Sequence, residues 1–223
     1  MNKKKYVEKS EIREKVIRAA SLAFMRHGVK QVRMDDIATD LSISKRTIYE
    51  LFTDKEELLL EVVKAHDQEV RDYVRQVEQR SQYVLETILA FYEKGVQDMR
   101  KINASFLQDI GKYEKVMDYL DQNRKENIQQ FMHFYELGVE QGLFRKDCNY
   151  QIVQSSLVYL RDFIFNENLN EHYKLSELYE TILSVYMRGI STEKGMKIVD
   201  DFLDERKALN KQNSIIEIET EKQ

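Results

Sequence analysis

The sequence predicts an all-α protein with a small N-terminal three-helix domain and a larger helical domain after it. Proline is absent from the 223 residues and glycine occurs only 7 times, so few residues that break helices are present. Apolar side chains recur at helical spacing along most of the chain. Residues 1–55 contain 13 basic and 8 acidic residues, a net charge of +5, whereas the remainder carries −9. The basic segment favours a polyanionic partner, and the acidic remainder favours a different role.

Three helices are predicted in the N-terminal domain. Ser10 is the expected N-cap of the first helix, and Gly28 is its expected terminator. Two shorter apolar stripes follow over residues 34–41 and 48–52, separated only by Ser42-Ile43-Ser44. Two short helices joined by so tight a turn predict a helix-turn-helix motif.

The remaining helices are predicted from a capping signal and from apolar stripes. Thr53-Asp54-Lys55-Glu56 predicts a capping box, in which Thr53 caps a long helix and Glu56 reaches back to it. That helix is expected to run to about residue 77 and to link a domain over 1–55 to one over 56–209. Further helices are predicted over 82–101, 103–109, 112–141, 149–166, 176–189 and 192–209, before a polar tail over 210–223.

The predicted third helix carries a polar face opposite its apolar stripe. The recognition helix of this motif enters the major groove, where Arg and Lys donate to guanine, Thr contacts a thymine methyl and Tyr reaches a phosphate. A Lys-Arg pair is usually only a solvated helix face. This pair, however, begins the third of three short helices in the basic segment, so double-stranded DNA is the expected partner. The expected DNA contacts are Ser44, Lys45, Arg46, Thr47 and Tyr49, with Arg33 and Lys55 on the flanking phosphates.

Residues 11–64 resemble the DNA-binding domain of the TetR family of transcriptional regulators. The matching residues are Ala23-Phe24, Gly28, Asp36-Ile37-Ala38, Ser44-Lys45-Arg46-Thr47-Ile48-Tyr49, Phe52 and Lys55-Glu56-Glu57-Leu58-Leu59. Ser42 departs from the family, which usually has glycine in this turn. The resemblance implies that Lys45, Arg46, Thr47 and Tyr49 contact DNA and that Lys55 contacts its backbone. It also implies a repressor that binds a palindromic operator as a homodimer and is released by a small-molecule effector.

The larger domain is predicted to serve dimerisation and effector binding. Gly138–Asp147 resembles the end of the seventh helix of TetR-family proteins, which implies that the next two helices form a four-helix bundle in a homodimer. Their wide apolar faces suit a partner as well as a core. The expected dimer residues are Ile152, Ser155, Ser156, Tyr159, Phe163, Leu178, Tyr179, Ile182 and Tyr186.

Aromatic residues are concentrated between positions 83 and 135, and ligand cavities are largely apolar with a few polar anchors. The residues expected to line a cavity for an apolar or aromatic effector are Phe91, Tyr92, Met99, Phe106, Phe131, Phe134 and Tyr135. Ordinary packing in the core is the alternative for each of these side chains.

No catalytic, metal or cofactor site is predicted. The four histidines lack metal-ligand spacing, Cys148 is the single cysteine, and no glycine-rich phosphate loop occurs. No apolar run reaches membrane-spanning length, so a cytoplasmic protein without a membrane partner is expected. An enzyme on a helical scaffold is disfavoured. The main alternative is a helical dimeric interaction protein that binds DNA without sequence preference.

Overall fold

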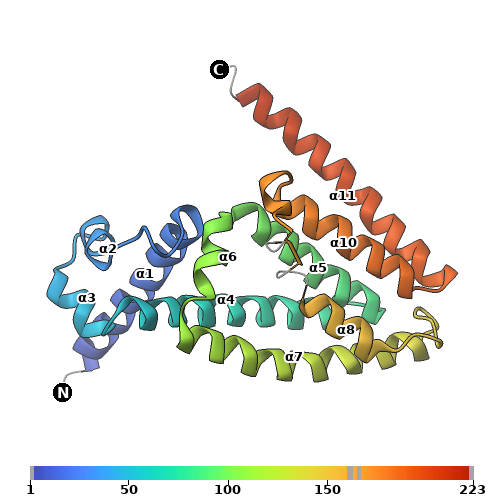
Figure 1. The fold of residues 1–223 in the computed structure, drawn as a ribbon, viewed down its shortest axis with the longest axis horizontal. Helices are drawn as coiled ribbons and strands as arrows, with labels where there is room; N and C mark the ends of the chain where they lie inside the picture. Colours follow the sequence, from blue (N-terminus) through green and yellow to red (C-terminus); the bar gives the residue numbers. More distant parts are fainter. Residues whose placement is uncertain (1–2, 160–162, 165–166, 221–223) are drawn as a thin grey trace.

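The computed structural model describes residues 3–159, 163–164 and 167–220, and for residues 3–8, 158 and 209–220 it describes the backbone alone. Helices account for nearly all of this part of the chain (Figure 1). Within it the only pairing of β type is an isolated antiparallel bridge between Phe144 and Ser191. The all-α prediction is therefore confirmed.

The N-terminal domain contains α1 (Lys3–His27), α2 (Met34–Asp40) and α3 (Lys45–Leu51). Their apolar faces meet in one core, in which Phe24, Ile48 and Phe52 are fully buried. α1 ends as predicted, because Gly28 adopts a left-handed backbone with φ of +78°. A tight turn joins α2 to α3, which confirms the helix-turn-helix motif.

The larger domain is arranged around α4 (Lys55–Glu78), which extends from the N-terminal domain along the body (Figure 1). In that view α5 lies on one side of α4 and α7 on the other, and α10 and α11 cover α5. The remaining elements of this domain are α5 (Val84–Lys101), α6 (Ala104–Ile110), α7 (Glu114–Glu140), α8 (Tyr150–Val158), the short 3-10 helix η1 (Leu169–Glu171), α10 (Leu175–Ile190) and α11 (Glu193–Thr220).

The buried apolar side chains form two separate hydrophobic cores. The N-terminal core includes residues that lie far along the sequence, in the larger domain. Phe106 and Ile110 of α6 and Val116 of α7 pack into the N-terminal core, although they lie far along the sequence. The second core is built from α5, the C-terminal half of α7, α10 and α11. α6 therefore lies against the N-terminal domain and forms part of the contact between the two domains.

Two predicted helix starts are wrong. α1 begins at Lys3, so Ser10 lies inside the helix and does not cap it; no glycine or proline precedes Ser10 to stop the helix from extending. The N-cap of α4 is Asp54, one residue later than the predicted Thr53. Asp54 accepts from the Glu57 backbone N–H at 2.7 Å, and the Glu57 carboxylate accepts from the Thr53 backbone N–H at 2.7 Å.

Two predicted helix ends differ from the structure. α8 ends at Val158, where Tyr159 has a ψ of 3°, outside the helical range; Phe163 and Ile164 are again helical, and residues 160–162 and 165–166 of the predicted helix lie outside the described residues. Asn168 then adopts a left-handed backbone with φ of 53°, which precedes η1. α11 continues past residue 209 to Thr220, since a polar sequence without glycine or proline does not by itself end a helix.

Candidate DNA-binding and effector sites

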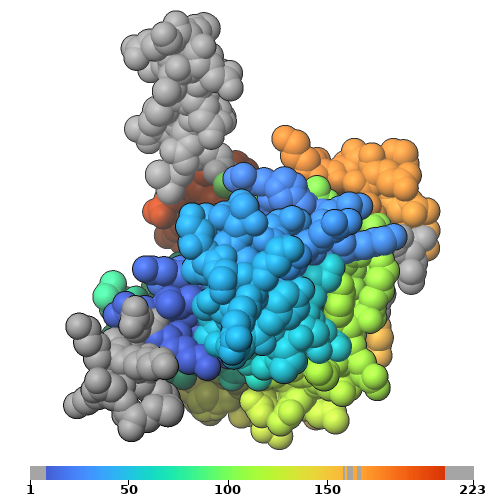
Figure 2. All heavy atoms as spheres, turned by 90° about the vertical axis from the view of Figure 1, so that its left-hand side faces the viewer, coloured from blue at the N-terminus to red at the C-terminus, as the bar shows by residue number. Residues whose placement is uncertain are grey.

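α3 separates an inward apolar face from an outward polar face. Ile48 and Phe52 are buried, whereas Lys45, Arg46 and Tyr49 are exposed. Figure 2 looks onto this end of the molecule, where the segment around α2 and α3 lies at the front. The polar side chains of α3 are thus on a surface that a large partner can approach.

Ser44 begins α3 as predicted. Its hydroxyl oxygen accepts from the backbone N–H of Thr47 at 3.0 Å, and the two hydroxyl groups are 2.8 Å apart. This N-cap satisfies one of the free N–H groups at the helix start and fixes the side chain of Thr47. The first turn of α3, which in this motif lies nearest the bases, is therefore held in place before any ligand arrives.

The basic side chains of α3 have acidic neighbours. Lys45 lies 2.7 Å from Asp35 of α2, and the hydrogen bond and charge of that carboxylate raise the pKa of Lys45. Nε of Arg46 donates to Glu50 at 2.7 Å within α3. Exposed ion pairs of this kind contribute little to stability. Either basic side chain can therefore exchange its carboxylate for an acceptor on a partner with little loss of free energy. Arg33, at the start of α2, is also exposed.

Lys55 has partners within the protein that the sequence did not indicate. Its ammonium group donates to the backbone carbonyls of Val29 at 2.9 Å, Lys30 at 3.4 Å and Val32 at 3.1 Å. Burial lowers the pKa of Lys55, opposed by the charge of Asp109. An ammonium group has three N–H donors, so these contacts occupy its donor capacity.

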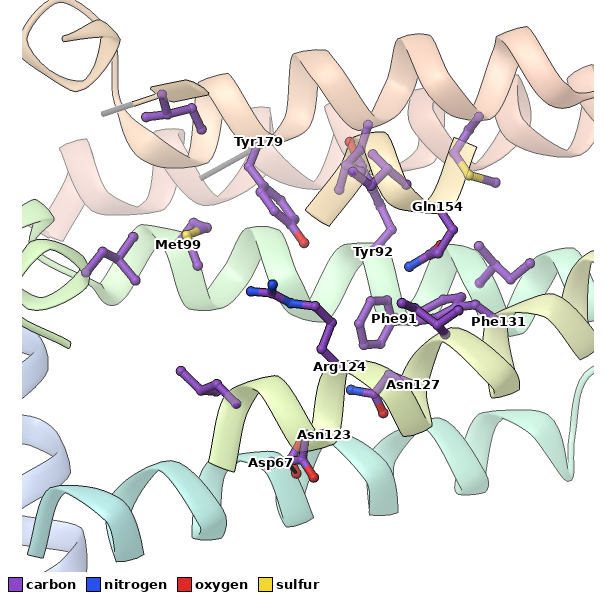
Figure 3. Close-up of a pocket in the computed structure, with 18 of the residues that line it drawn as sticks. Asp67, Phe91, Tyr92, Met99, Asn123, Arg124, Asn127, Phe131, Gln154 and Tyr179 are labelled. Carbon is purple, nitrogen blue, oxygen red and sulfur yellow. Dashed lines mark hydrogen bonds between the residues drawn. The ribbon is translucent and has the colours of Figure 1, made fainter. Parts of the chain in front are cut away.

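A cavity of about 450 Å³ lies in the larger domain, between α4, α5, α7, α8 and α10 (Figure 3). Its size is within the usual range for small-molecule sites. Of the residues predicted to line a pocket, five do so: Phe91, Tyr92, Met99, Phe131 and Tyr135. Apolar side chains from α6, α7 and α10 complete most of the remaining wall.

Two of the predicted pocket residues lie elsewhere. Phe106 is buried in the N-terminal core, because α6 packs against α1. Phe134 is buried in the second core; it does not line this cavity but lines a smaller one of about 140 Å³, together with Phe91 and Phe131. Core packing, the alternative considered for each aromatic residue, applies to Phe106.

Sequence reasoning missed the polar residues of the cavity. Asp67, Asn123, Arg124, Asn127 and Gln154 all line it (Figure 3). Arg124 could have been found, because it interrupts the apolar stripe that runs along α7 through Met117, Leu120, Ile128 and Phe131. A charge within such a stripe is the signal for a polar group that faces an interior space.

The surface formed by α8, the described residues just after it and α10 carries apolar side chains that no described part of the protomer covers. Ile152 is 67% exposed, Tyr159 64%, Phe163 52% and Val185 65%. The first three are among the residues predicted at the dimer interface. Ser155 and Ser156 are exposed beside them, and Ser156 Oγ lies 3.0 Å from the hydroxyl of Tyr186. Leu178, Ile182 and Tyr186 are half-buried.

Tyr179 is a correction to the predicted dimer surface. Its ring points into the cavity and packs on Gly95 of α5, where an added Cβ would lie 2.9 Å from the ring (Figure 3). The missing side chain at position 95 leaves the room for this inward orientation.

α6 connects the cavity to the DNA-binding end. Leu107 lines the cavity. Two residues later Asp109 accepts from the Lys30 backbone N–H at 2.8 Å, and at the start of α6 the Asn103 N–H donates to the Met25 carbonyl at 2.8 Å. α6 therefore contacts both the cavity and the N-terminal domain, so a displacement of α6 at the cavity would be transmitted to the loop between α1 and α2.

Groups of three or more potential metal ligands are absent from the described part of the chain. None of the helices within that part is long and apolar enough to span a membrane.

Comparison with known proteins agrees with this geometry. Residues 16–62 match the sequence profile of bacterial regulatory proteins of the tetR family. No curated protein sequence matches the chain.

Solved structures with the same fold cover most of the chain. A transcriptional regulator from Saccharomonospora viridis in complex with choline has 20% identity and a TM-score of 0.68, over 82% of this chain and 100% of that one. A TetR-family regulator from Agrobacterium tumefaciens has 13% identity and a TM-score of 0.67, over 82% and 100%. The ketosteroid transcriptional regulator KstR2 of Mycobacterium tuberculosis has 17% identity and a TM-score of 0.56, over 81% and 95%. The N-terminal segment therefore matches the tetR family of bacterial regulatory proteins over residues 16–62, and the chain as a whole has the fold of TetR-family transcriptional regulators.

Proposed function

We propose that this protein is a cytoplasmic repressor that binds a palindromic DNA operator as a homodimer and is released by a small-molecule effector. The observation that carries the proposal is the outward face of α3, where Lys45, Arg46 and Tyr49 are exposed and Thr47 is fixed by the Ser44 cap. Such a face matches the donors and methyl groups that read base edges in a major groove.

Each side chain on this face has a role in the proposal. Arg46 and Lys45 donate to guanine, Thr47 contacts a thymine methyl and Tyr49 contacts a phosphate. Arg33 neutralises a flanking phosphate. Lys55 was expected on a phosphate too, but its bonds to three carbonyls support a role in holding the α1–α2 loop.

Dimerisation is supported by the exposed apolar side chains of α8 and α10. A palindromic site requires that a dimer joined through this surface has its two α3 helices on the same side. Half-sites one helical turn apart are spaced by about 34–36 Å. Effector release is supported by the cavity and by the contacts of α6 with the α1–α2 loop. The choline complex of the Saccharomonospora viridis regulator supports a small-molecule site in this fold.

The proposal is tested by selecting bound sequences from a pool of random DNA duplexes at near-physiological salt. A Lys45→Ala/Arg46→Ala/Tyr49→Ala variant runs alongside. A Lys197→Ala/Lys207→Ala variant is the matched control, because it removes the same amount of positive charge from α11. We expect an inverted repeat to be enriched by the native protein and by the control, and not by the α3 variant. Enrichment of no common sequence, or equal enrichment by the α3 variant, would favour the interaction-protein alternative.

A further inference from the structure

The charged residues of the cavity wall differ in whether they are already paired. Asp67 and Arg124 are the only charged side chains among the described residues that line it. Oδ2 of Asp67 accepts from Arg71 at 2.7 Å, Tyr119 at 2.9 Å and Asn123 at 2.6 Å. The guanidinium of Arg71 balances the charge of Asp67, so this carboxylate attracts a cationic ligand only weakly.

Arg124 is held much more weakly. Its single ion pair within the described chain is with Asp121, at 3.5 Å, and both side chains are about half exposed. Such a pair contributes little and is readily exchanged for a better partner. Figure 3 shows the guanidinium of Arg124 extending from α7 into the cavity.

Two uncharged polar groups lie in the same space. The hydroxyl of Tyr179 points into the cavity towards Arg124 in the view of Figure 3, and Asn127 lies one turn after Arg124 on α7. Neither side chain has a hydrogen-bond partner among the described residues. Burial raises the pKa of Tyr179 to about 12, so its hydroxyl is protonated at neutral pH and can donate.

From these observations we infer that the cavity takes an amphipathic carboxylate, with its anionic group at Arg124 and Tyr179 and its apolar body against Phe91, Phe131 and their neighbours. The inference rests on the proposed function, because it names the chemical class of the effector at the same cavity. A planar guanidinium binds a carboxylate with two parallel hydrogen bonds. The rest of the wall is mainly Ile, Leu, Met and Phe, which favours an apolar chain or ring.

The test compares ligands that differ in charge and share an apolar body. Decanoate and naphthoate are titrated into the purified full chain, in the absence of DNA, by isothermal calorimetry. Decanol and naphthol are the uncharged counterparts, and decyltrimethylammonium reverses the charge. We expect at least one carboxylate to bind more tightly than its alcohol by about 10-fold or more, and the cation to bind most weakly.

Variants locate the site. Arg124→Met keeps most of the side-chain volume and is expected to weaken carboxylate binding by about 10- to 100-fold, with the alcohol unaffected. Tyr179→Phe is expected to weaken it by about 2- to 10-fold. Lys125→Met, at the exposed neighbouring position outside the cavity, is the matched control and should change nothing.

Preference for the alcohols or the cation, absence of carboxylate binding, or an Arg124→Met variant that binds carboxylates normally would each overturn the inference. These results are independent of DNA. Release of the selected operator by the carboxylate that binds is measured separately by fluorescence anisotropy. If a carboxylate binds tightly and does not release the operator, the inferred ligand class holds and the proposed effector role is wrong. If no operator is selected, the proposed function is wrong, but the calorimetric titrations still test the ligand class.

Discussion

The ammonium group of Lys55 lies 2.9 Å from the carbonyl oxygen of Val29, so the first residue of α4 is bonded to the loop that follows α1. The same group reaches the carbonyls of Lys30 and Val32. Asp109 of α6 also contacts this loop, because it accepts from the Lys30 N–H. The loop between α1 and α2 is therefore held from both α4 and α6, the two helices that connect it to the larger domain.

Replacing Lys55 by Met should lower the free energy of unfolding by about 1–3 kcal/mol, because it leaves carbonyl oxygens of the loop without their donor. Urea unfolding followed by circular dichroism measures this. Lys45→Met is the matched control; Lys45 is exposed and should affect DNA binding more than stability.

The salt dependence of operator binding separates the two roles considered for Lys55. We expect the slope of log K against log salt to stay unchanged in Lys55→Met, since the ammonium is bonded within the protein. A slope smaller by about one would instead indicate the phosphate contact that the sequence suggested.

Replacing Ser42 by glycine should stabilise the protein. Ser42 has φ of +54° in the turn between α2 and α3, a left-handed backbone that costs a non-glycine residue about 1–2 kcal/mol. Ser42→Gly removes this strain at some cost in chain entropy, so we expect a net gain of up to about 1 kcal/mol, or a rise in Tm of about 2–4 °C. A calorimetric scan measures it. Ser42→Ala should bring no gain, and an equal gain there would refute strain as the cause.

The features predicted correctly from sequence depend on local periodicity. The faces of α3 follow from helical spacing within seven residues, and Gly28 ends α1 because its left-handed backbone is a property of the local chain. The N-cap of α4 was misplaced by one residue, since Thr53 and Asp54 are both good N-caps and the sequence alone does not choose between them.

The features that were missed depend on contacts between helices far apart in sequence. Phe106 was placed in a pocket because it lies among the aromatic residues concentrated between positions 83 and 135, whereas α6 packs against α1. The inward orientation of Tyr179 depends on the room left by Gly95, 84 positions earlier in the chain. Neither relation leaves a periodic signal in the sequence.

Val185→Asp should dissociate the proposed homodimer. Val185 is 65% exposed in the protomer, so the substitution should leave folding nearly unchanged while it places a charge in an apolar interface. Sedimentation velocity measures the oligomeric state. Leu22→Asp is the matched control, because Leu22 is 68% exposed but lies on α1. A Val185→Asp protein that remained dimeric would place the interface on another surface.

Asp109 should make stability depend on pH on the acid side. Burial would raise the pKa of Asp109, but the hydrogen bonds from Lys112 and from the backbone of Lys30 outweigh it and lower the pKa below its ordinary value. A carboxyl group whose pKa is lower in the folded state binds fewer protons there than in the unfolded chain. Its contribution is therefore complete above about pH 4 and is lost as the pH falls through the folded-state pKa.

Asp109→Asn should accordingly be less stable than the native protein by about 1–3 kcal/mol at neutral pH, and the difference should shrink as the pH falls below about 4. Urea unfolding at a series of pH values measures both quantities. Asp201→Asn, at an exposed position of α11, should run parallel to the native protein throughout. A difference between Asp109→Asn and the native protein that stayed constant with pH would mean that the charge of Asp109 does not hold α6 to the α1–α2 loop.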